Sequence, residues 1–265
     1  MYEHVIYYYS GTGNSLWTAL ALQRALGSCE VLPIGESSGQ LPKAQSIGFV
    51  FPCHFGGVPG KVLDFFANLD TPKPSNPYCY AVVTYGVMPG AALGQAEEAL
   101  GAREITLNNA VSLKSFASYV VGYDMSDKVA EKTAEAKESL QEILPSIIER
   151  ETAKIKKPSP LLLAYNKRCT NELGKKDENF VVSESCESCG TCRQVCSAHN
   201  IRFDEGRPHW LNHCEQCLAC LQWCPKHAIN YGEKTRNRGR YTHPEITSRL
   251  FIENLNRAGA SSSEQ

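Results

Sequence analysis

The sequence predicts an α/β fold, in which a five-stranded parallel sheet with helices on both faces is followed by a small α+β unit. Across residues 1–150, short apolar, β-prone runs alternate with helical runs, which is typical of repeated strand–helix–strand units. A glycine-rich loop joins the first of these strands to the first helix. Further along the chain, eight of the twelve cysteines fall within residues 186–224. These observations indicate two kinds of structure in one chain of 265 residues.

The predicted elements of the first unit follow one another closely. Strands are expected at residues 5–9, 31–34, 46–51, 78–84 and 104–107. Helices are expected at residues 16–26, 61–69, 91–100 and 126–149. In a sheet of this kind, ligands bind at the carboxyl ends of the strands, beside the point where the strand order reverses. The loops after the first, third and fourth strands should therefore converge on one crevice.

The loop after the first strand has the composition of a phosphate site. It consists of glycines among hydroxyl and amide side chains: Ser10, Gly11, Thr12, Gly13, Asn14 and Ser15. In such turns, backbone N–H groups and the N-terminus of the next helix bind phosphate. The loop has no lysine, which disfavours a P-loop, and Leu16 stands where a dinucleotide fingerprint has its third glycine. The pattern suits a phosphate monoester, although a glycine-rich turn can also be purely structural.

This loop resembles the first loop of flavodoxin, which binds the phosphate of FMN. The resemblance implies that the loops after the third and fourth strands hold the isoalloxazine ring. These loops supply the other candidate residues: Pro52, Cys53, His54, Phe55, Gly56, Gly57, Thr84, Tyr85, Gly86, Pro89 and Gly90. His54 and Phe55 on one side and Tyr85 on the other are the stacking candidates. Each of these aromatic side chains could instead serve core or loop packing, and Cys53 is more typical of a buried apolar residue than of a reactive thiol.

Eight cysteines form two runs with the same spacing, C-x2-C-x2-C-x3-C. The first run is Cys186, Cys189, Cys192 and Cys196, and the second is Cys214, Cys217, Cys220 and Cys224. A shift of 28 positions, from Cys186 to Cys214, superposes every cysteine and carries Ile201 onto Ile229. The spacing, with Pro225 after the second run, is the bacterial ferredoxin pattern, in which the fourth cysteine of each run ligates the other cluster.

The sequence therefore predicts two 4Fe–4S clusters with crossed ligands. One is assigned to Cys186, Cys189, Cys192 and Cys224, and the other to Cys214, Cys217, Cys220 and Cys196. Structural zinc is the alternative, since paired C-x2-C motifs also form four-cysteine zinc sites. Zinc sites need no exchange of ligands between runs, however, and they lack the x2-x2-x3 spacing. Ser197 departs from the pattern, because a second C-P pair would place proline there.

Composition divides the chain into four segments. They are a flavin unit at 1–150, a linker with a covering helix at 151–176, a two-cluster unit at 177–235 and an extension at 236–265. The two-cluster unit should open with a strand at 180–182 that pairs with one at 229–231. The extension continues a basic strip. It is either solvated, or it forms a strap, and such a strap would pack the cluster unit onto the flavin unit or dock an acidic partner. Residues 258–265 are small and polar, and we expect them to be disordered.

The charge balance disfavours some classes of partner. A formal net charge of −1 and a pI near 6.7 give no indication of a nucleic-acid or membrane surface. The sequence has no apolar run long enough to span a bilayer and no recognisable signal peptide. Oxygen-sensitive clusters and the cysteine usage lead us to expect a cytoplasmic protein of an anaerobe.

Taken together, the chain resembles the fused flavodoxin–ferredoxin electron carriers of anaerobic microbes. The resemblance rests on the first loop, the loops after residues 51 and 84, the eight cluster cysteines, and residues 210–220 and 240–244. It implies electron transfer between FMN and two 4Fe–4S clusters, with redox partner proteins as donor and acceptor. A flavin-dependent oxidoreductase acting on NAD(P) or a quinone is the alternative, and a metal-stabilised scaffold with a vestigial flavin pocket is a third. Apart from His54, no catalytic acid or base stands out near the predicted ring, which favours the carrier.

Overall fold

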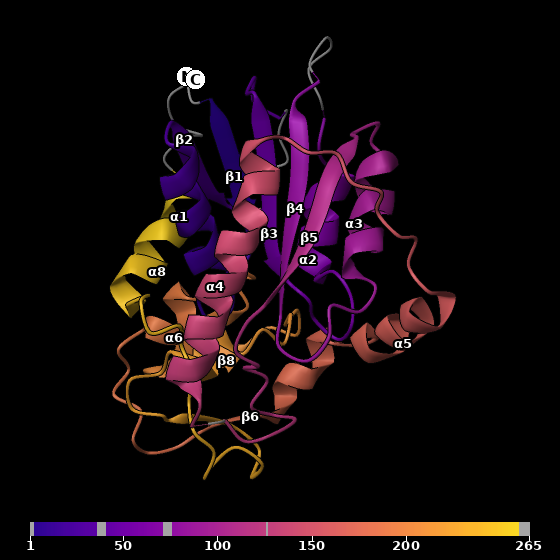
Figure 1. The fold of residues 1–265 in the computed structure, drawn as a ribbon. Helices are drawn as coiled ribbons and strands as arrows, with labels where there is room; N and C mark the ends of the chain where they lie inside the picture. The colour runs from indigo at the N-terminus through magenta and orange to yellow at the C-terminus, as the bar shows by residue number, and fades with distance from the viewer. Residues whose placement is uncertain (1–2, 36–40, 71–75, 126, 260–265) are drawn as a thin grey trace.

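The computed structural model describes residues 3–35, 41–70, 76–125 and 127–259. Five strands form one parallel sheet (Figure 1): β1 (His4–Tyr8), β2 (Cys29–Pro33), β3 (Ser46–Pro52), β4 (Tyr78–Tyr85) and β5 (Leu107–Lys114). Their order is β2-β1-β3-β4-β5, which is the order of the flavodoxin-like fold and has its switch point between β1 and β3. The predicted fold class is confirmed for this sheet.

Helices cover both faces of the sheet. Figure 1 shows α1 (Asn14–Leu26) and α4 (Val129–Ile148) on one face, with α2 (Gly60–Ala67) and α3 (Ala92–Gly101) on the other. The central strands β3 and β4 are mostly apolar and are buried along nearly their whole length, as expected when both faces are covered. In β3, for example, Val50 packs into the core beneath α1 and α4, whereas Phe49 and Phe51 pack into the core beneath α2 and α3.

The predicted fifth strand is wrong in position. Residues 104–107 were expected to form it, but β5 begins at Leu107, and Glu104 adopts a left-handed turn with φ 58°. As the edge strand, β5 has several part-exposed positions and contains Asn108 and Asn109, so its sequence reads as a loop. Helix α4 begins at Val129 rather than at residue 126, which lies outside the described residues.

The cysteine-rich part consists of short elements. They are η1 (Gly174–Asn179), β6 (Phe180–Val182), α6 (Thr191–Gln194), β7 (Ile201–Asp204), β8 (Arg207–Trp210), α7 (Ala219–Gln222) and β9 (Ile229–Tyr231). The predicted pairing of residues 180–182 with 229–231 is confirmed as β6 with β9, which run antiparallel. The hairpin of β7 and β8 was not predicted.

The backbone of this part repeats with the 28-residue period of the cysteines. Phe180 pairs with Tyr231, and the shifted positions, Pro208 and Phe203, pair with each other. Left-handed backbone conformations recur in the same register at Ser188 and Gln216, Gly190 and Leu218, and His199 and His227. The internal repeat seen in the sequence is therefore a pseudo-twofold repeat of the structure.

The C-terminal extension packs against the sheet unit and is not a solvated tail. Arg238 donates to the Val120 carbonyl at 2.7 Å, and the Tyr241 hydroxyl donates to Asn14 at 2.6 Å. Helix α8 (Ser248–Leu255) follows and lies beside α1 (Figure 1). The strap interpretation is thus correct as regards packing. Residues 258–259 belong to the short helix η2 (Asn256–Gly259), and the remainder of the predicted disordered tail, 260–265, lies outside the described residues.

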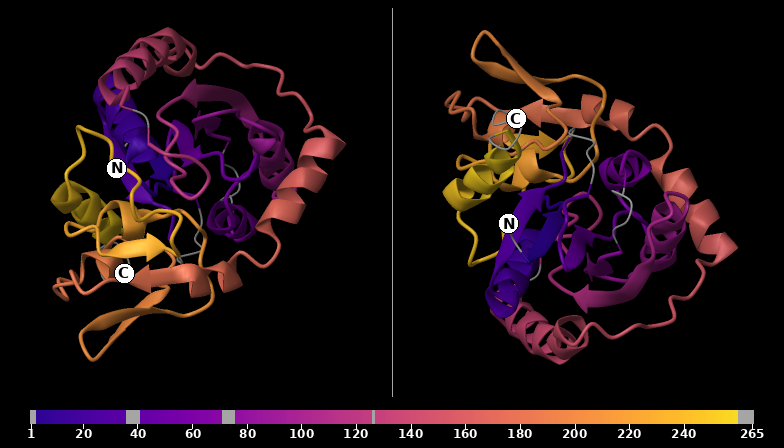
Figure 2. Two further views of the ribbon diagram at one scale, coloured as in Figure 1. Left: turned by 90° about the horizontal axis from the view of Figure 1, so that it is seen from below. Right: turned by 90° about the horizontal axis from the view of Figure 1, so that it is seen from above.

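The linker between the two parts carries α5 (Pro160–Thr170), which lies within the segment 151–176 where a linker with a covering helix is expected. Figure 2 shows this helix running along the outside of the molecule between the sheet unit and the cysteine-rich part. Within the described ranges, none of the helices combines the length and the apolar character that crossing a membrane requires.

Candidate functional site

A cavity of about 370 Å³ lies at the carboxyl ends of the strands, at the switch point between β1 and β3. Loops that follow β1, β3 and β4 meet there, as the sequence predicted. Thirteen of the predicted contact residues line it: Ser10, Gly11, Thr12, Asn14, Ser15, Pro52, Cys53, His54, Phe55, Gly56, Thr84, Tyr85 and Gly86. Residues from three separate loops thus share one enclosed space.

Four predicted residues lie behind this lining and shape the loops instead: Gly13, Gly57, Pro89 and Gly90. Gly13 adopts φ 98° and begins α1. The amide N–H groups of Gly57 and His54 donate to each other's carbonyl groups, both at 2.9 Å, which closes a tight turn. A side chain at Gly90 would place its Cβ 2.2 Å from the Gly56 carbonyl oxygen. Glycine is therefore required there by a close approach of two backbones.

One end of the cavity has the properties of a phosphate site. The Ser10 hydroxyl accepts a hydrogen bond from the Gly13 N–H at 3.1 Å, and the Ser15 and Thr84 hydroxyls are 2.8 Å apart. The first N–H groups of α1 have no partner within the helix. The first turn of α1 carries no acidic residue, so no side chain there opposes a bound anion.

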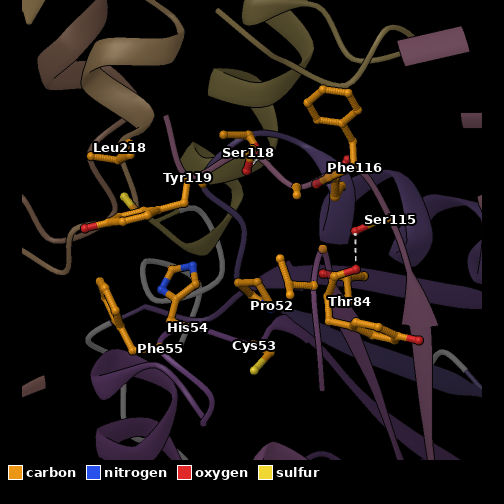
Figure 3. Close-up of a pocket in the computed structure, with 18 of the residues that line it drawn as sticks. Pro52, Cys53, His54, Phe55, Thr84, Ser115, Phe116, Ser118, Tyr119 and Leu218 are labelled. Atoms are coloured by element: carbon orange, nitrogen blue, oxygen red, sulfur yellow. Dashed lines mark hydrogen bonds between the residues drawn. The ribbon is translucent and has the colours of Figure 1, made fainter. Parts of the chain in front are cut away.

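The other end is aromatic. Figure 3 shows Tyr119 across from His54, with Phe55 beside them, whereas Thr84, Ser115 and Phe116 lie on the opposite side. The Phe55 and Tyr119 rings meet edge to face, with centroids 5.3 Å apart. Tyr119 belongs to residues 115–119, which follow β5 and line the cavity. Sequence reasoning missed this loop because it placed the fifth strand too early.

His54 is a neutral imidazole in this setting. Burial lowers its pKa to about 4, and its Nδ1 atom has no hydrogen-bond partner in the described part of the chain. A shielded, unpaired nitrogen is unfavourable unless a ligand pairs with it. The observation fits a bound molecule with polar atoms on its edge.

The linker helix α5 forms a further wall that the sequence did not reveal. Tyr165 lines the cavity, and Asn166 is the buried residue of this helix. The Asn166 amide lies 3.3 Å from the His54 carbonyl oxygen and 3.2 Å from that of Phe55, and it accepts a hydrogen bond from Gln95. The helix thus holds the turn that carries the aromatic side chains. The sequence had suggested a helix over the seam, but not its contact with this loop.

The second cysteine run provides the remaining wall. Gln216, Cys217 and Leu218 all line the cavity. A Cβ on Gly11 would lie 2.6 Å from the Cys217 carbonyl oxygen, and the Trp223 indole N–H donates to the Gly11 carbonyl at 2.9 Å. The predicted phosphate loop is therefore in direct contact with the loop of Cys217.

The eight cysteines fall into two groups of four. Cys186, Cys189, Cys192 and Cys224 line one small cavity, and Cys196, Cys214, Cys217 and Cys220 line another. The fourth sulfur of each run accepts an equivalent hydrogen bond, from Asn200 N–H to Cys196 and from Ala228 N–H to Cys224, both at 3.3 Å. Each cavity thus takes three cysteines from one run and one from the other.

Four cysteine side chains line each of the two small cavities. Among the described residues, no three His, Cys, Asp or Glu side chains are arranged to hold a single metal ion. Thiolates on one zinc ion would lie about 3.8 Å apart, given the Zn–S distance of ~2.3 Å. Four cysteine thiolates are also the usual ligand set of a 4Fe–4S cluster. Burial raises the pKa of Cys192 and of Cys217 to about 12, so a bound metal would have to displace their protons.

The C-terminal extension supports the loop at residues 10–15 from behind. The His243 N–H donates to the Thr12 carbonyl at 2.8 Å, and the His243 ring stacks on Trp17 with centroids 4.9 Å apart. Glu245 N–H donates to His243 Nδ1 at 3.2 Å, which requires an unprotonated nitrogen. Burial lowers the pKa of His243 to about 4.

Mild acid should therefore loosen this support. The pKa of His243 lies below its usual 6.5, so the unfolded chain binds the proton first, and stability is lost as the pH falls from about 6.5 towards 4. The loss is about 1.4 kcal/mol per pH unit within that window, and about 3 kcal/mol in total. Denaturant unfolding at pH 7 and pH 5 checks this. A His243→Phe variant, which keeps an aromatic ring but does not titrate, should show a smaller difference, and an equal difference would contradict the expectation.

Comparisons with known proteins give only distant similarities. No family model and no curated protein matches the chain. Among solved structures, Megasphaera elsdenii flavodoxin in its two-electron reduced form is 17% identical, with 52% of this chain and 98% of that chain covered and a TM-score of 0.34. An azoreductase from Bacillus anthracis is 10% identical, with 56% and 100% covered and a TM-score of 0.37. Rubredoxin oxygen:oxidoreductase from the anaerobe Desulfovibrio gigas is 15% identical, with 53% and 36% covered and a TM-score of 0.32.

Proposed function

We propose that this chain is an electron-transfer protein that binds FMN in the cavity and a 4Fe–4S cluster at each group of four cysteines. One observation carries the proposal. A single cavity is lined at one end by the hydroxyl–glycine loop and elsewhere by the loop of Cys217, a member of one crossed cysteine group. A flavin in this cavity would lie against the polypeptide that holds a cluster.

The residues around the cavity fit the parts of FMN. Backbone N–H groups of the first loop and of the α1 N-terminus would bind the phosphate. Tyr119, Phe55 and the neutral His54 would enclose the ring. Tyr85 lines the cavity as well, and it stays a stacking candidate.

The same geometry supports an order for the three redox centres. The group of Cys196, Cys214, Cys217 and Cys220 shares Cys217 with the flavin cavity, so we place its cluster next to the flavin. The other group includes Cys189, which is exposed, so we place its cluster towards an external partner. Cys192 and Cys220, one from each group, are both buried in the same apolar cluster.

The chemistry follows from the electron capacity of such cofactors: a bound flavin exchanges one or two electrons, and each cluster exchanges one. The chain itself would hold the centres close together and exclude water. Trp223 and Gln222 fix the cysteine-rich part to the sheet unit through hydrogen bonds of 2.9 Å to Gly11 and 2.8 Å to Ser118. Backbone N–H groups that donate to Cys196 and Cys224 would tune the clusters.

A second candidate function is supported by the mouth of the cavity. Val87 is 74% exposed and Met88 is 51% exposed, and both line the cavity, as do the exposed Tyr123 and Tyr165. An apolar, accessible rim would let a planar molecule such as a nicotinamide or a quinone approach the flavin. Catalytic reoxidation of the reduced protein by NAD(P)+ or a quinone, measured by anaerobic stopped-flow, would favour this reductase over the pure carrier.

Purification under anaerobic conditions tests the main proposal. We expect broad absorbance near 400 nm, about eight iron atoms and eight sulfides per chain for two cubane clusters, and about one FMN released on denaturation. Zinc in place of iron would contradict the cluster assignment. A protein with both clusters that fails to bind added FMN would contradict the flavin assignment.

A further inference from the structure

Gln216 occupies the seam between the predicted flavin site and a predicted cluster site. It lies between Cys214 and Cys217, and it lines the flavin cavity together with Cys217 and Leu218. We propose that the Gln216 carboxamide hydrogen-bonds to the edge of the isoalloxazine ring. The loop that holds a cluster would then also be part of the flavin site. This inference rests on the proposed binding of FMN.

The carboxamide is buried without being satisfied by the protein. Gln216 is 2% exposed, and neither Oε1 nor Nε2 has a hydrogen-bond partner in the described part of the chain. The Tyr231 hydroxyl lies in its vicinity but does not form a bond of normal geometry with it. Buried amides are nearly always paired, so an unpaired one that faces a cavity indicates a missing ligand.

The position of Gln216 is set by the backbone of the cysteine loop. Its N–H donates to Cys214 Sγ at 3.2 Å, and its φ is 52° in the left-handed region. Ser188 holds the equivalent place in the first run, with φ 56°. The Ser188 hydroxyl donates to the Gly206 carbonyl and so has a partner within the protein. The two loops therefore share a backbone conformation, but the loop at the flavin cavity carries a longer side chain whose amide is unpaired.

The chemistry of a carboxamide matches the edge of a flavin ring. Glutamine offers two N–H donors and one carbonyl acceptor, so it can pair with a ring edge that presents both carbonyl oxygens and an N–H group. His54 brings a second unpaired polar atom to the same cavity from the loop after β3. Gln216 and His54 would thus contact the ring from the two separate parts of the chain.

The test compares Gln216→Ser with Ser188→Ala in the cluster-loaded, FMN-free protein. Serine is chosen because Ser188 shows that this backbone conformation accepts it. In Gln216→Ser, the dissociation constant of FMN, measured by fluorescence titration under anaerobic conditions, should rise about tenfold, as for loss of a buried hydrogen bond. The midpoint potential of the bound flavin should also shift. Ser188→Ala, which alters the matching loop position, should leave both quantities unchanged.

Stability separates a ligand contact from a structural role. Removing an unpaired buried amide should leave the FMN-free protein as stable as the wild type, or more stable. A lower unfolding midpoint for Gln216→Ser without FMN would overturn the inference, because Gln216 would then support the fold. Unchanged FMN affinity with a shifted cluster potential would overturn it as well, because the amide would then serve the cluster. If the wild-type protein itself fails to bind FMN, the proposed function fails before this inference is reached.

Discussion

Replacing Gly11 by alanine should lower the free energy of unfolding by about 2–4 kcal/mol and weaken FMN binding by at least about tenfold. The added Cβ would lie 2.6 Å from the Cys217 carbonyl oxygen and 3.1 Å from the Cys217 Cβ. The first is a backbone atom and the second is the first side-chain atom of a proposed cluster ligand, so neither can move away at a low cost in free energy. The phosphate loop and the second cysteine run must therefore separate.

This separation would also break the hydrogen bond from the Trp223 indole to the Gly11 carbonyl, which is buried and 2.9 Å long. Trp223 itself packs on Phe251 of α8, so the effect extends to the C-terminal extension. Anaerobic denaturant unfolding and FMN titration measure the two consequences. Trp223→Phe keeps an aromatic ring but loses the N–H donor. This variant should lower the free energy of unfolding and weaken FMN binding by less than Gly11→Ala does.

Gly101→Ala is the matched control for this substitution. Gly101 lies at the C-terminal end of α3, and a Cβ added there meets no atom within 4 Å. Alanine has the higher helix propensity, so the control should be neutral or slightly stabilising. If Gly11→Ala and Gly101→Ala had equal effects on the free energy of unfolding and on FMN binding, the close approach of Gly11 to Cys217 would not determine how the first loop packs on the second cysteine run.

Much of the sheet unit could be predicted because its strands carry their signal locally. The central strands β1, β3 and β4 are mostly apolar and lead into loops that contain glycine, so the loops could be located and their convergence inferred. The cysteine groups were also predictable, because a spacing that repeats with a 28-residue period identifies equivalent positions. In both cases, the residues that give the signal lie close together, within one strand and its loop or within one cysteine run.

What could not be predicted depends on contacts between distant segments. Tyr119 follows an edge strand whose asparagines resemble a turn, so its loop had no clear place. Asn166 has no distinctive sequence context, yet its amide contacts a turn more than a hundred residues away. The strap formed by Tyr241 and His243 packs through single hydrogen bonds and ring stacking, which leave no periodic pattern.

The position of the proposed flavin cavity relative to the cysteines also depends on contacts between distant segments. Because the repeat makes the two cysteine runs equivalent, the sequence could not distinguish which run lies beside the cavity at the carboxyl ends of the strands. The structure distinguishes them through residues that break the repeat. Trp223, which bonds to Gly11, corresponds to Val195 in the first run, and Gln216 corresponds to Ser188. The residues that differ between the two runs therefore determine which run packs against the sheet unit, which the shared cysteine pattern cannot determine.

Pairs of cysteine substitutions should show whether the two runs exchange ligands. In the crossed arrangement, Cys186 and Cys224 line one cavity, and Cys196 and Cys214 line the other. The double variant Cys186→Ser with Cys224→Ser should therefore lose one cluster and keep about four of about eight iron atoms. The double variant Cys196→Ser with Cys224→Ser should lose a ligand from both clusters and retain little iron. The two variants change the same number of cysteines, so each is the control for the other.

An arrangement without exchange gives a different result for Cys186→Ser with Cys224→Ser, whereas Cys196→Ser with Cys224→Ser loses a ligand from both clusters in either arrangement. Cys196 would then belong with Cys186, and Cys224 with Cys214, so the pair Cys186 and Cys224 would affect both clusters. Iron and sulfide analysis, with electron paramagnetic resonance of the reduced proteins, distinguishes the two arrangements. The cluster kept by Cys186→Ser with Cys224→Ser should also be the one beside the flavin, since Cys217 lines that cavity. Flavin in this variant should still be reduced together with the remaining cluster, whereas Cys196→Ser with Cys214→Ser should leave it without a neighbouring centre.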